Sequence, residues 1–235
     1  MSGAAVLDEF LTSQPASVHN SERRLAKFVR EAYPIGVPAM IMKSSTDRIG
    51  ESAGYSFHLG TPDEILRLIA SWLLTEAGAD QSVLRKLVKR LWKRHGREDV
   101  ALAALILANL DFSSEELDPW VILASSINQK EPADAILLSI EEILRAGHPR
   151  PTVEMLVSWC NGRMVDSHLA LISTYVAFTR SGELNEEVKE ILAGVKVPSE
   201  DSLLRRIKTK LEGTEPKSSF VKVLSGGHEG KAAAL

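Results

Sequence analysis

The sequence predicts an all-α fold. After residue 64, apolar residues recur almost everywhere at the three- and four-residue spacing of amphipathic helices. No segment alternates apolar and polar residues over the length of a strand. The predicted helices also come in regular pairs, whose first members begin near Glu64, Glu98, Pro132 and Val165, at steps of 34, 34 and 33 residues. This regularity is typical of stacked helical repeats and predicts a right-handed α-α superhelix, with the second helices of the pairs along its concave side.

The first 60 residues do not follow this repeat. Their pattern predicts a helix over residues 21–32, a rigid connector at YPIGVP (residues 33–38) and another helix over residues 40–53. We therefore expect residues 1–60 to form an N-terminal helical cap on the open end of the stack.

The first helix pair has clear start and stop signals. Thr61 is the candidate N-cap of a helix in which Glu64 stands at the capping-box position, and Gly78 ends that helix. The next helix carries an apolar stripe over residues 84–92, and Gly96 stops it. Two antiparallel helices are expected.

Three further pairs and a last helix follow. The remaining predicted helices cover residues 98–110, 117–127, 132–147, 153–159, 165–179, 184–192 and 203–211. Residues 61–212 thus form the repeat region, and residues 213–235, rich in Gly, Ser and Lys, are expected to be a flexible tail of what is otherwise a single domain.

Composition narrows the class of protein. With 235 residues and 44% hydrophobic content the chain is expected to be globular, and no apolar run approaches the ~20 residues that span a bilayer. Asp8 and Glu9 precede any Lys or Arg, which is unlike a signal peptide. We expect a cytoplasmic monomer that does not contact membranes. The single Cys160, the scattered histidines and the lack of a Gly-rich phosphate loop predict neither a metal site nor a cofactor.

Charge is concentrated in one segment. Residues 83–97 carry seven of the 28 basic residues and no acid, which leaves 21 basic against 31 acidic side chains elsewhere in a chain of net charge −3. Seven cations without partners on their own helix repel one another, and a polyanion would relieve that repulsion. Alternatively the segment is an ordinary solvent face, or is neutralised by acids from a neighbouring repeat. The candidate DNA-binding residues here are Lys86, Lys89, Arg90, Lys93, Arg94 and Arg97.

Three features then occur in a fixed order. YPIGVP follows an amphipathic helix, LWKRHGREDVALAALILANLD spans residues 91–111, and Trp120 comes soon after. In this order they resemble the HEAT-like DNA alkylation repair proteins, glycosylases that remove alkylated purines from DNA. The resemblance covers most of residues 20–212 and implies a superhelix of HEAT-like pairs that binds DNA.

The resemblance also identifies site positions. In that family a catalytic aspartate follows the tryptophan by four residues, where a carboxylate stabilises positive charge on the sugar. Here that position is Ala124, which implies weak or absent base excision. The family's paired arginines, which hold the DNA backbone, correspond to residues 164–168, with only Arg163 nearby. Trp120 and Arg163 therefore join the DNA-binding candidates.

Two other functions remain open at this point. One is a noncatalytic scaffold whose concave surface holds an acidic protein segment. The other is an active alkylpurine DNA glycosylase in which Asp118 or Glu131 replaces the missing aspartate.

Overall fold

The computed structural model describes residues 3–47, 54–113, 118–128 and 131–213, and within these ranges the chain is helical and contains no strand. The all-α prediction is confirmed. The helices are α1 (Gly3–Thr12), the 3-10 helix η1 (Ala16–Asn20), α2 (Glu22–Ala32), α3 (Ala39–Asp47), α4 (Asp63–Ala77), α5 (Ser82–Arg94), α6 (Arg97–Ala108), α7 (Pro119–Ser126), α8 (Ala133–Arg145), α9 (Val153–Cys160), α10 (Met164–Ser181), α11 (Glu186–Ala193) and α12 (Ser202–Leu211). None of the helices described is long and apolar enough to cross a membrane.

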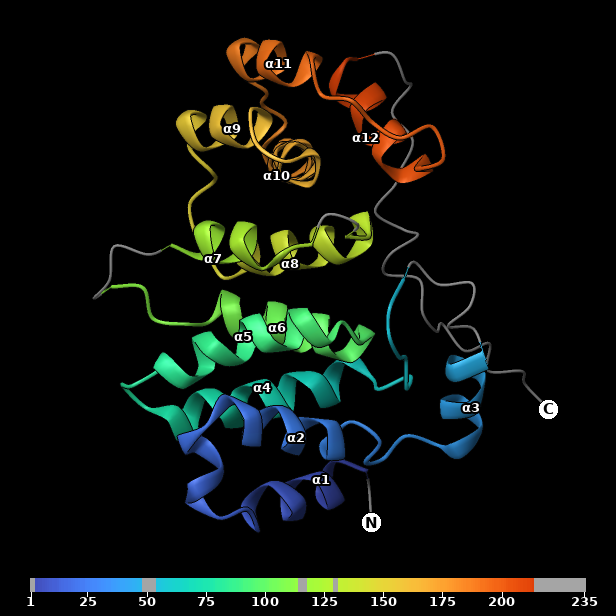
Figure 1. Cartoon of the computed structure of the whole chain (residues 1–235), viewed down its shortest axis with the longest axis vertical. Helices are drawn as coiled ribbons and strands as arrows, with labels where there is room; N and C mark the ends of the chain where they lie inside the picture. The colour runs from blue at the N-terminus through green and yellow to red at the C-terminus, as the bar shows by residue number, and fades with distance from the viewer. Residues whose placement is uncertain (1–2, 48–53, 114–117, 129–130, 214–235) are drawn as a thin grey trace, which may run out of the picture.

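Four helices form the central row of the stack. α4, α6, α8 and α10 begin at positions 63, 97, 133 and 164, each within one residue of a predicted start. α4 packs on α6, α6 on α8 and α8 on α10 (Figure 1). The middle of this row is enclosed on all sides, since every residue of α6 from Glu98 to Ala108 is buried. A helix that is apolar all round requires such a position.

The other helices cover this row. α5 packs against α2 and α6, α7 against α5 and α6, α9 against α10 and α11, and α12 against α10. The N-terminal helices α1 and α2 belong to the same core, a single cluster of buried residues that extends from Leu7 to Leu211. The predicted helix over residues 40–53 is observed only as far as Asp47, and residues 48–53 and most of the predicted tail lie outside the described residues.

Thr61 does not cap α4, contrary to the prediction. The N-cap is Pro62, which offers no side-chain hydrogen bond. The Thr61 hydroxyl instead turns inward and donates to the carbonyl oxygen of Tyr33 at 3.0 Å. This contact between distant segments takes the place of the local cap that the sequence pattern indicated.

The described part of the α3–α4 connector holds the turn between α5 and α6. Ser56 N–H donates to the carbonyl of His95 at 2.8 Å, and Arg97 N–H donates to that of Phe57 at 2.9 Å. His95 adopts the left-handed conformation (φ 59°) that ends α5. A Cβ at position 96 would stand 2.0 Å from the Phe57 ring, so a residue larger than Gly96 would have to displace that ring. Both ends of this turn are therefore fixed.

Candidate functional site

A basic groove runs between α2 and α5. It is an open cavity of about 940 Å³. Two acidic side chains, Glu22 and Glu31, line it together with Ala26. Its other lining residues are eight cations, Arg23, Lys27, Arg30, Lys86, Lys89, Arg90, Lys93 and Arg94.

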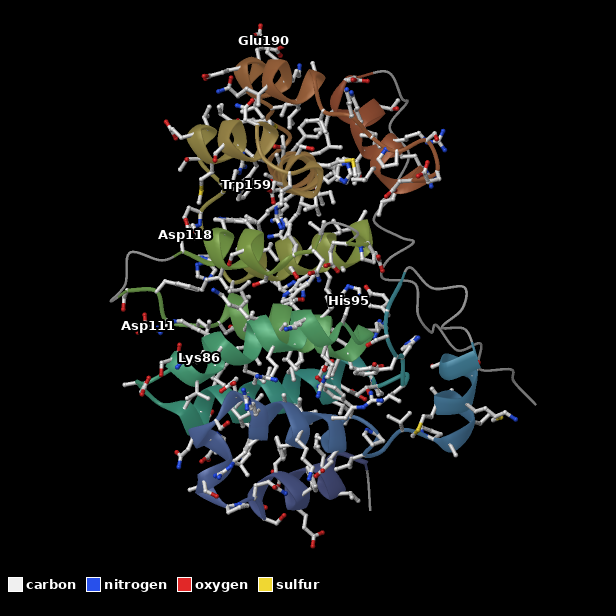
Figure 2. The ribbon with its side chains drawn as sticks, in the orientation of Figure 1. Lys86, His95, Asp111, Asp118, Trp159 and Glu190 are labelled. Atoms are coloured by element: carbon white, nitrogen blue, oxygen red, sulfur yellow. The ribbon has the colours of Figure 1, made fainter. Side chains whose placement is uncertain are left out.

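Both helices are amphipathic, and this property orients the cations. On α2, Leu25, Phe28 and Val29 are buried in the core, and on α5 the buried residues include Leu87 and Leu91. Each helix therefore turns its polar face outward, and because α2 and α5 pack side by side the two basic faces adjoin. Figure 2 shows Lys86 and His95 at opposite ends of α5.

The contribution of α2 was absent from the sequence prediction. Arg23, Lys27 and Arg30 stand at positions i, i+4 and i+7, which places them on one face of a helix. That spacing was the available signal. It was hidden by the neighbouring Glu22 and Glu31, which reduce the four cations of residues 22–31 to a net charge of +2 in a simple count, against +7 for residues 83–97.

Two arginines of α5 make ion pairs with neighbouring helices. Arg90 Nη2 lies 3.1 Å from Glu22 Oε1 across the groove. The Arg94 guanidinium makes a two-pronged ion pair with Asp99 at the start of α6 and also donates to the carbonyl of Ala26 on α2. Acids outside α5 thus neutralise part of the basic segment: Asp99, of the next predicted helix pair, for Arg94, and Glu22, of the predicted N-terminal cap, for Arg90.

The carboxylate of Asp99 is fully buried. Tyr33 donates its hydroxyl to Asp99 Oδ1 at 2.9 Å, so this carboxylate joins the connector after α2 to the end of α5. Burial, and then the neighbouring Asp99 charge, raise the pKa of Tyr33 well above its usual value, which keeps the hydroxyl a proton donor. Because this charge is buried, removing one of its partners would be costly.

The lysines of α5 differ from its arginines. Lys86, Lys89 and Lys93 are exposed, and among the described residues none of them makes a salt bridge or a side-chain hydrogen bond. Arg23 and Lys27 on α2 are also exposed, with only long contacts of 3.9 Å to acids on their own helix. Exposed pairs of this kind contribute little. Five cations in the groove are thus available to a ligand.

Two other arginines lie near one end of α5. Arg97 is exposed at the start of α6 but does not line the basic groove, unlike the other five candidates of the segment. Arg30 stacks on Phe57, with its guanidinium carbon 3.5 Å from the ring centroid. The α3–α4 connector thereby supports the groove through Phe57.

Trp120 is a core residue, so the structure does not support its predicted contact with DNA. Its side chain is 1% exposed and lies 6.4 Å, centroid to centroid, from the ring of Trp159. Its indole N–H donates to the carbonyl of Pro149 at 2.9 Å. A nucleobase could reach the ring only if the surrounding helices separated, because the ring lies in the core together with Ile122 and Leu123 of α7.

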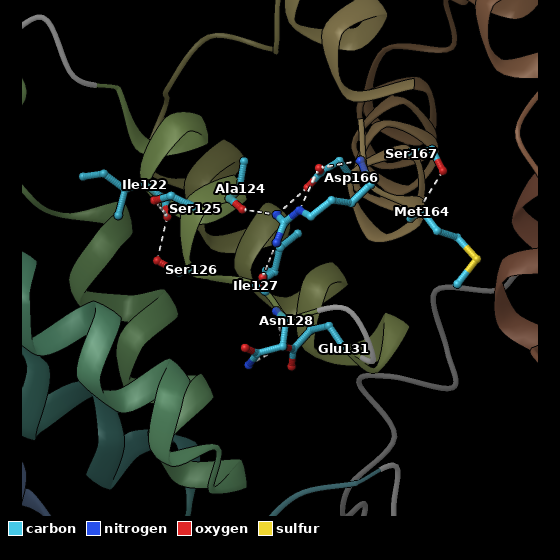
Figure 3. A network of polar contacts seen from close by, with 11 residues as sticks. Ile122, Ala124, Ser125, Ser126, Ile127, Asn128, Glu131, Met164, Asp166 and Ser167 are labelled. Atoms are coloured by element: carbon cyan, nitrogen blue, oxygen red, sulfur yellow. Dashed lines mark hydrogen bonds and ion pairs between the residues drawn. The ribbon is translucent and has the colours of Figure 1, made fainter. Parts of the chain in front are cut away.

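Arg163 connects the start of α10 to the end of α7. Figure 3 shows Asp166 of α10 facing Ala124 and Ile127 at this point. Its guanidinium pairs with Asp166 and donates to the carbonyl oxygens of Ala124 at 2.7 Å and Ile127 at 3.2 Å, at the end of α7. The hydrogen bond with Asp166 raises the pKa of Arg163. These contacts satisfy helix-end carbonyls, so the structure shows a structural task for this residue, and its DNA contact stays a prediction.

The two carboxylates considered as substitutes for the missing aspartate are both engaged. Asp118 caps α7, accepting from Val121 N–H at 2.9 Å. Glu131 is bound by His95 Nε2 and by the backbone N–H of Asn128 at 3.1 Å. Both carboxylates therefore already hold local structure in place.

A second basic surface lies at α12. A cavity of about 800 Å³ there is lined by Lys196, Arg205, Arg206 and Lys208, and Lys208 Nζ donates to the carbonyl of Val195 at 2.7 Å. The basic segment of α5 is therefore not the chain's sole cationic surface. In the part of the chain that the structure describes, no three His, Cys, Asp or Glu side chains lie close enough together to hold a metal ion.

Comparisons of the chain with protein-family models, with curated proteins and with solved structures gave no match.

Proposed function

We propose that this protein binds duplex DNA by its phosphate backbone in the basic groove. The observation that carries the proposal is the gathering of eight cationic side chains against two acids around one open cavity. Because no aromatic ring is among the described residues that line this groove, it offers no surface on which exposed bases could stack. Backbone contacts give affinity that depends on salt and not on sequence.

The architecture that would present this groove is also a proposal. The regular starts of α4, α6, α8 and α10 support HEAT-like pairs, α4 with α5 and onward, wound into a right-handed superhelix. In that arrangement α5, as the second helix of its pair, would line the concave side. We propose that the protein binds DNA in this way in the cytoplasm, as a monomer.

Base excision would be weak or absent in this function. Ala124 stands where the alkylation repair family has its aspartate, and Trp120 is enclosed in the core. Incubation of methylated duplex DNA with excess protein, followed by measurement of released alkylpurine, tests this part. Release above the uncatalysed background would show that another group does the chemistry.

The binding proposal is tested by making the same change of charge on two different surfaces. Fluorescence anisotropy of a labelled duplex is measured for wild type, for Lys89→Glu/Lys93→Glu in the groove, and for Lys196→Glu/Arg205→Glu at α12. Both double variants change net charge equally, so they differ only in place. We expect the groove variant to lose at least tenfold in affinity, and the α12 control to lose much less.

Equal losses in both variants would mean that overall charge alone governs binding, and an intact affinity in the groove variant would refute the site. A competing polyglutamate peptide is added in the same assay. Preference for that peptide over the duplex would favour the alternative of a scaffold for acidic protein segments.

A further inference from the structure

His95 lies at the end of α5, where the described part of the α3–α4 connector meets the turn into α6. Both nitrogens of its ring are engaged. Nδ1 lies 3.2 Å from the carbonyl oxygen of Gly54, the first described residue of the connector. Nε2 contacts Oε1 of Glu131, in the loop before α8. The side chain of His95 is 17% exposed, and that of Glu131 is fully buried.

These two partners require a charged ring. A carbonyl oxygen and a carboxylate oxygen both accept hydrogen bonds, so each contact needs an N–H group from His95. A neutral imidazole carries one N–H group, whereas the imidazolium carries two. His148 and His168 differ, because the ring of each meets one carbonyl oxygen through Nε2, that of Ala108 and that of Lys196 respectively.

The groups around His95 favour its charged form. The hydrogen bond with Glu131 raises the pKa of His95 more than partial burial lowers it, and the charges of Glu131 and Asp134 add to the rise. The Tyr55 ring stacks on His95 with the centroids 5.4 Å apart, and its hydroxyl donates to Asp134 of α8 at 3.1 Å. Burial, and then the Asp134 charge, raise the pKa of Tyr55, so this hydroxyl keeps its proton while His95 titrates. Arg97 of α6 is a cation close to Tyr55.

Loss of one proton would affect the two contacts unequally. The carboxylate of Glu131 is charged and buried, so it is the stronger acceptor and keeps the remaining proton on Nε2. Nδ1 is then left with a lone pair that faces the carbonyl oxygen of Gly54, and two acceptors in this position repel each other. We propose that the proton on Nδ1 of His95 fastens the connector to the end of α5, and that deprotonation releases the connector at Gly54.

The sign of the pH dependence follows from the raised pKa of His95. The contact with Gly54 is complete below the usual pKa of histidine and is lost as the pH rises through the raised pKa.

The release is confined to the start of the connector. Ser56 N–H donates to the backbone carbonyl of His95, and Arg97 N–H donates to the carbonyl of Phe57. Neither hydrogen bond involves the ring that titrates. Phe57 therefore keeps its place beneath the basic groove, and the fastening at Gly54 does not depend on the proposed DNA binding.

NMR of the whole protein tests this proposal. Long-range proton–nitrogen correlation spectra between about pH 5 and about pH 9 report which ring nitrogens of His95 carry a proton. We expect both at the lower pH and Nε2 alone at the higher. The backbone order parameter of Gly54 should fall with the same midpoint, whereas that of Ser56 should not change. A proton that stays on Nδ1, or a Gly54 order parameter independent of pH, would overturn the proposal.

Variants separate the fastening from a general effect of pH. Asparagine suits the left-handed conformation of residue 95, so His95→Asn should fold and should make the Gly54 order parameter independent of pH. Glu131→Gln keeps the shape of the acceptor without its charge, and should lower the midpoints of His95 titration and Gly54 release together. His148→Asn is the control and should keep the wild-type profile.

Two results with these variants would count against the proposal. A Gly54 order parameter that still falls with pH in His95→Asn would mean that another group releases the connector. An unchanged midpoint in Glu131→Gln would mean that Glu131 does not hold the proton on the ring.

Discussion

Replacing Lys89 and Lys93 by alanine should change the salt dependence of DNA binding by a definable amount. Each phosphate neutralised by a bound cation contributes about −0.9 to the slope of log affinity against log salt concentration. The five exposed cations of the groove, if all contact phosphates, predict a slope of about −4.5 for the wild type. Removing two of them predicts about −2.7.

These slopes separate clearly in an ordinary titration. Between about 50 and 200 mM salt, the wild type should lose about 500-fold in affinity and the variant about 40-fold. The assay is anisotropy of a labelled duplex at several salt concentrations. Since both lysines are exposed and make no salt bridge among the described residues, a thermal melt of the variant should match that of the wild type.

Two results would refute this reasoning. Weaker binding with an unchanged slope would mean that the lysines act through the shape of the protein and not through phosphate contacts. An equal loss of slope in Lys196→Ala/Arg205→Ala would mean that DNA is held at α12 as much as at the groove.

Three further predictions concern stability. Asp99→Asn leaves the partly buried Arg94 without its counter-charge and should lower the free energy of unfolding by about 3–5 kcal/mol in urea; a loss below about 1 kcal/mol would contradict the role of this pair. Because its hydrogen bond with Glu131 raises the pKa of His95, the stability from this contact is complete below about pH 6.5 and is lost as the pH rises through the raised pKa. The melting temperature of wild type should therefore fall over that range relative to His95→Gln, and parallel pH profiles would count against this. Trp120→Ala should lower the free energy of unfolding by about 3–5 kcal/mol without changing the DNA affinity of the folded protein, and a specific loss of affinity would return this residue to the interface.

Features that depend on local sequence could be predicted. The starts of α4, α6, α8 and α10 follow from apolar periodicity and from turn residues, which act within one or two helical turns. The burial of α6 from Val100 to Ala108 follows in the same way, because this part of the helix has no polar face. The basic face of α5 could be predicted from the spacing of its cations alone.

Features set by contacts between distant segments could not be predicted. The groove requires α2 beside α5, and the Arg90–Glu22 ion pair that joins them spans 68 residues of sequence. The Thr61 hydroxyl does not cap α4 but donates to a carbonyl oxygen 28 residues away in the sequence. Trp120 corresponds to a family position only by its order along the chain. Order does not determine which face of α7 is covered by other helices, and here the Trp120 ring packs near Trp159.

The division between arginines and lysines on α5 has a practical consequence. Arg90 and Arg94 hold the helix in place, whereas Lys86, Lys89 and Lys93 only face the groove. Acetylation of primary amines neutralises lysine and leaves guanidinium groups untouched. Treatment with an acetylating reagent would thus remove the positive charge of the three lysines that face the groove. The ion pairs of Arg90 and Arg94 would persist, so the charge of α5 could be changed while the helix stays folded and its sequence stays the same.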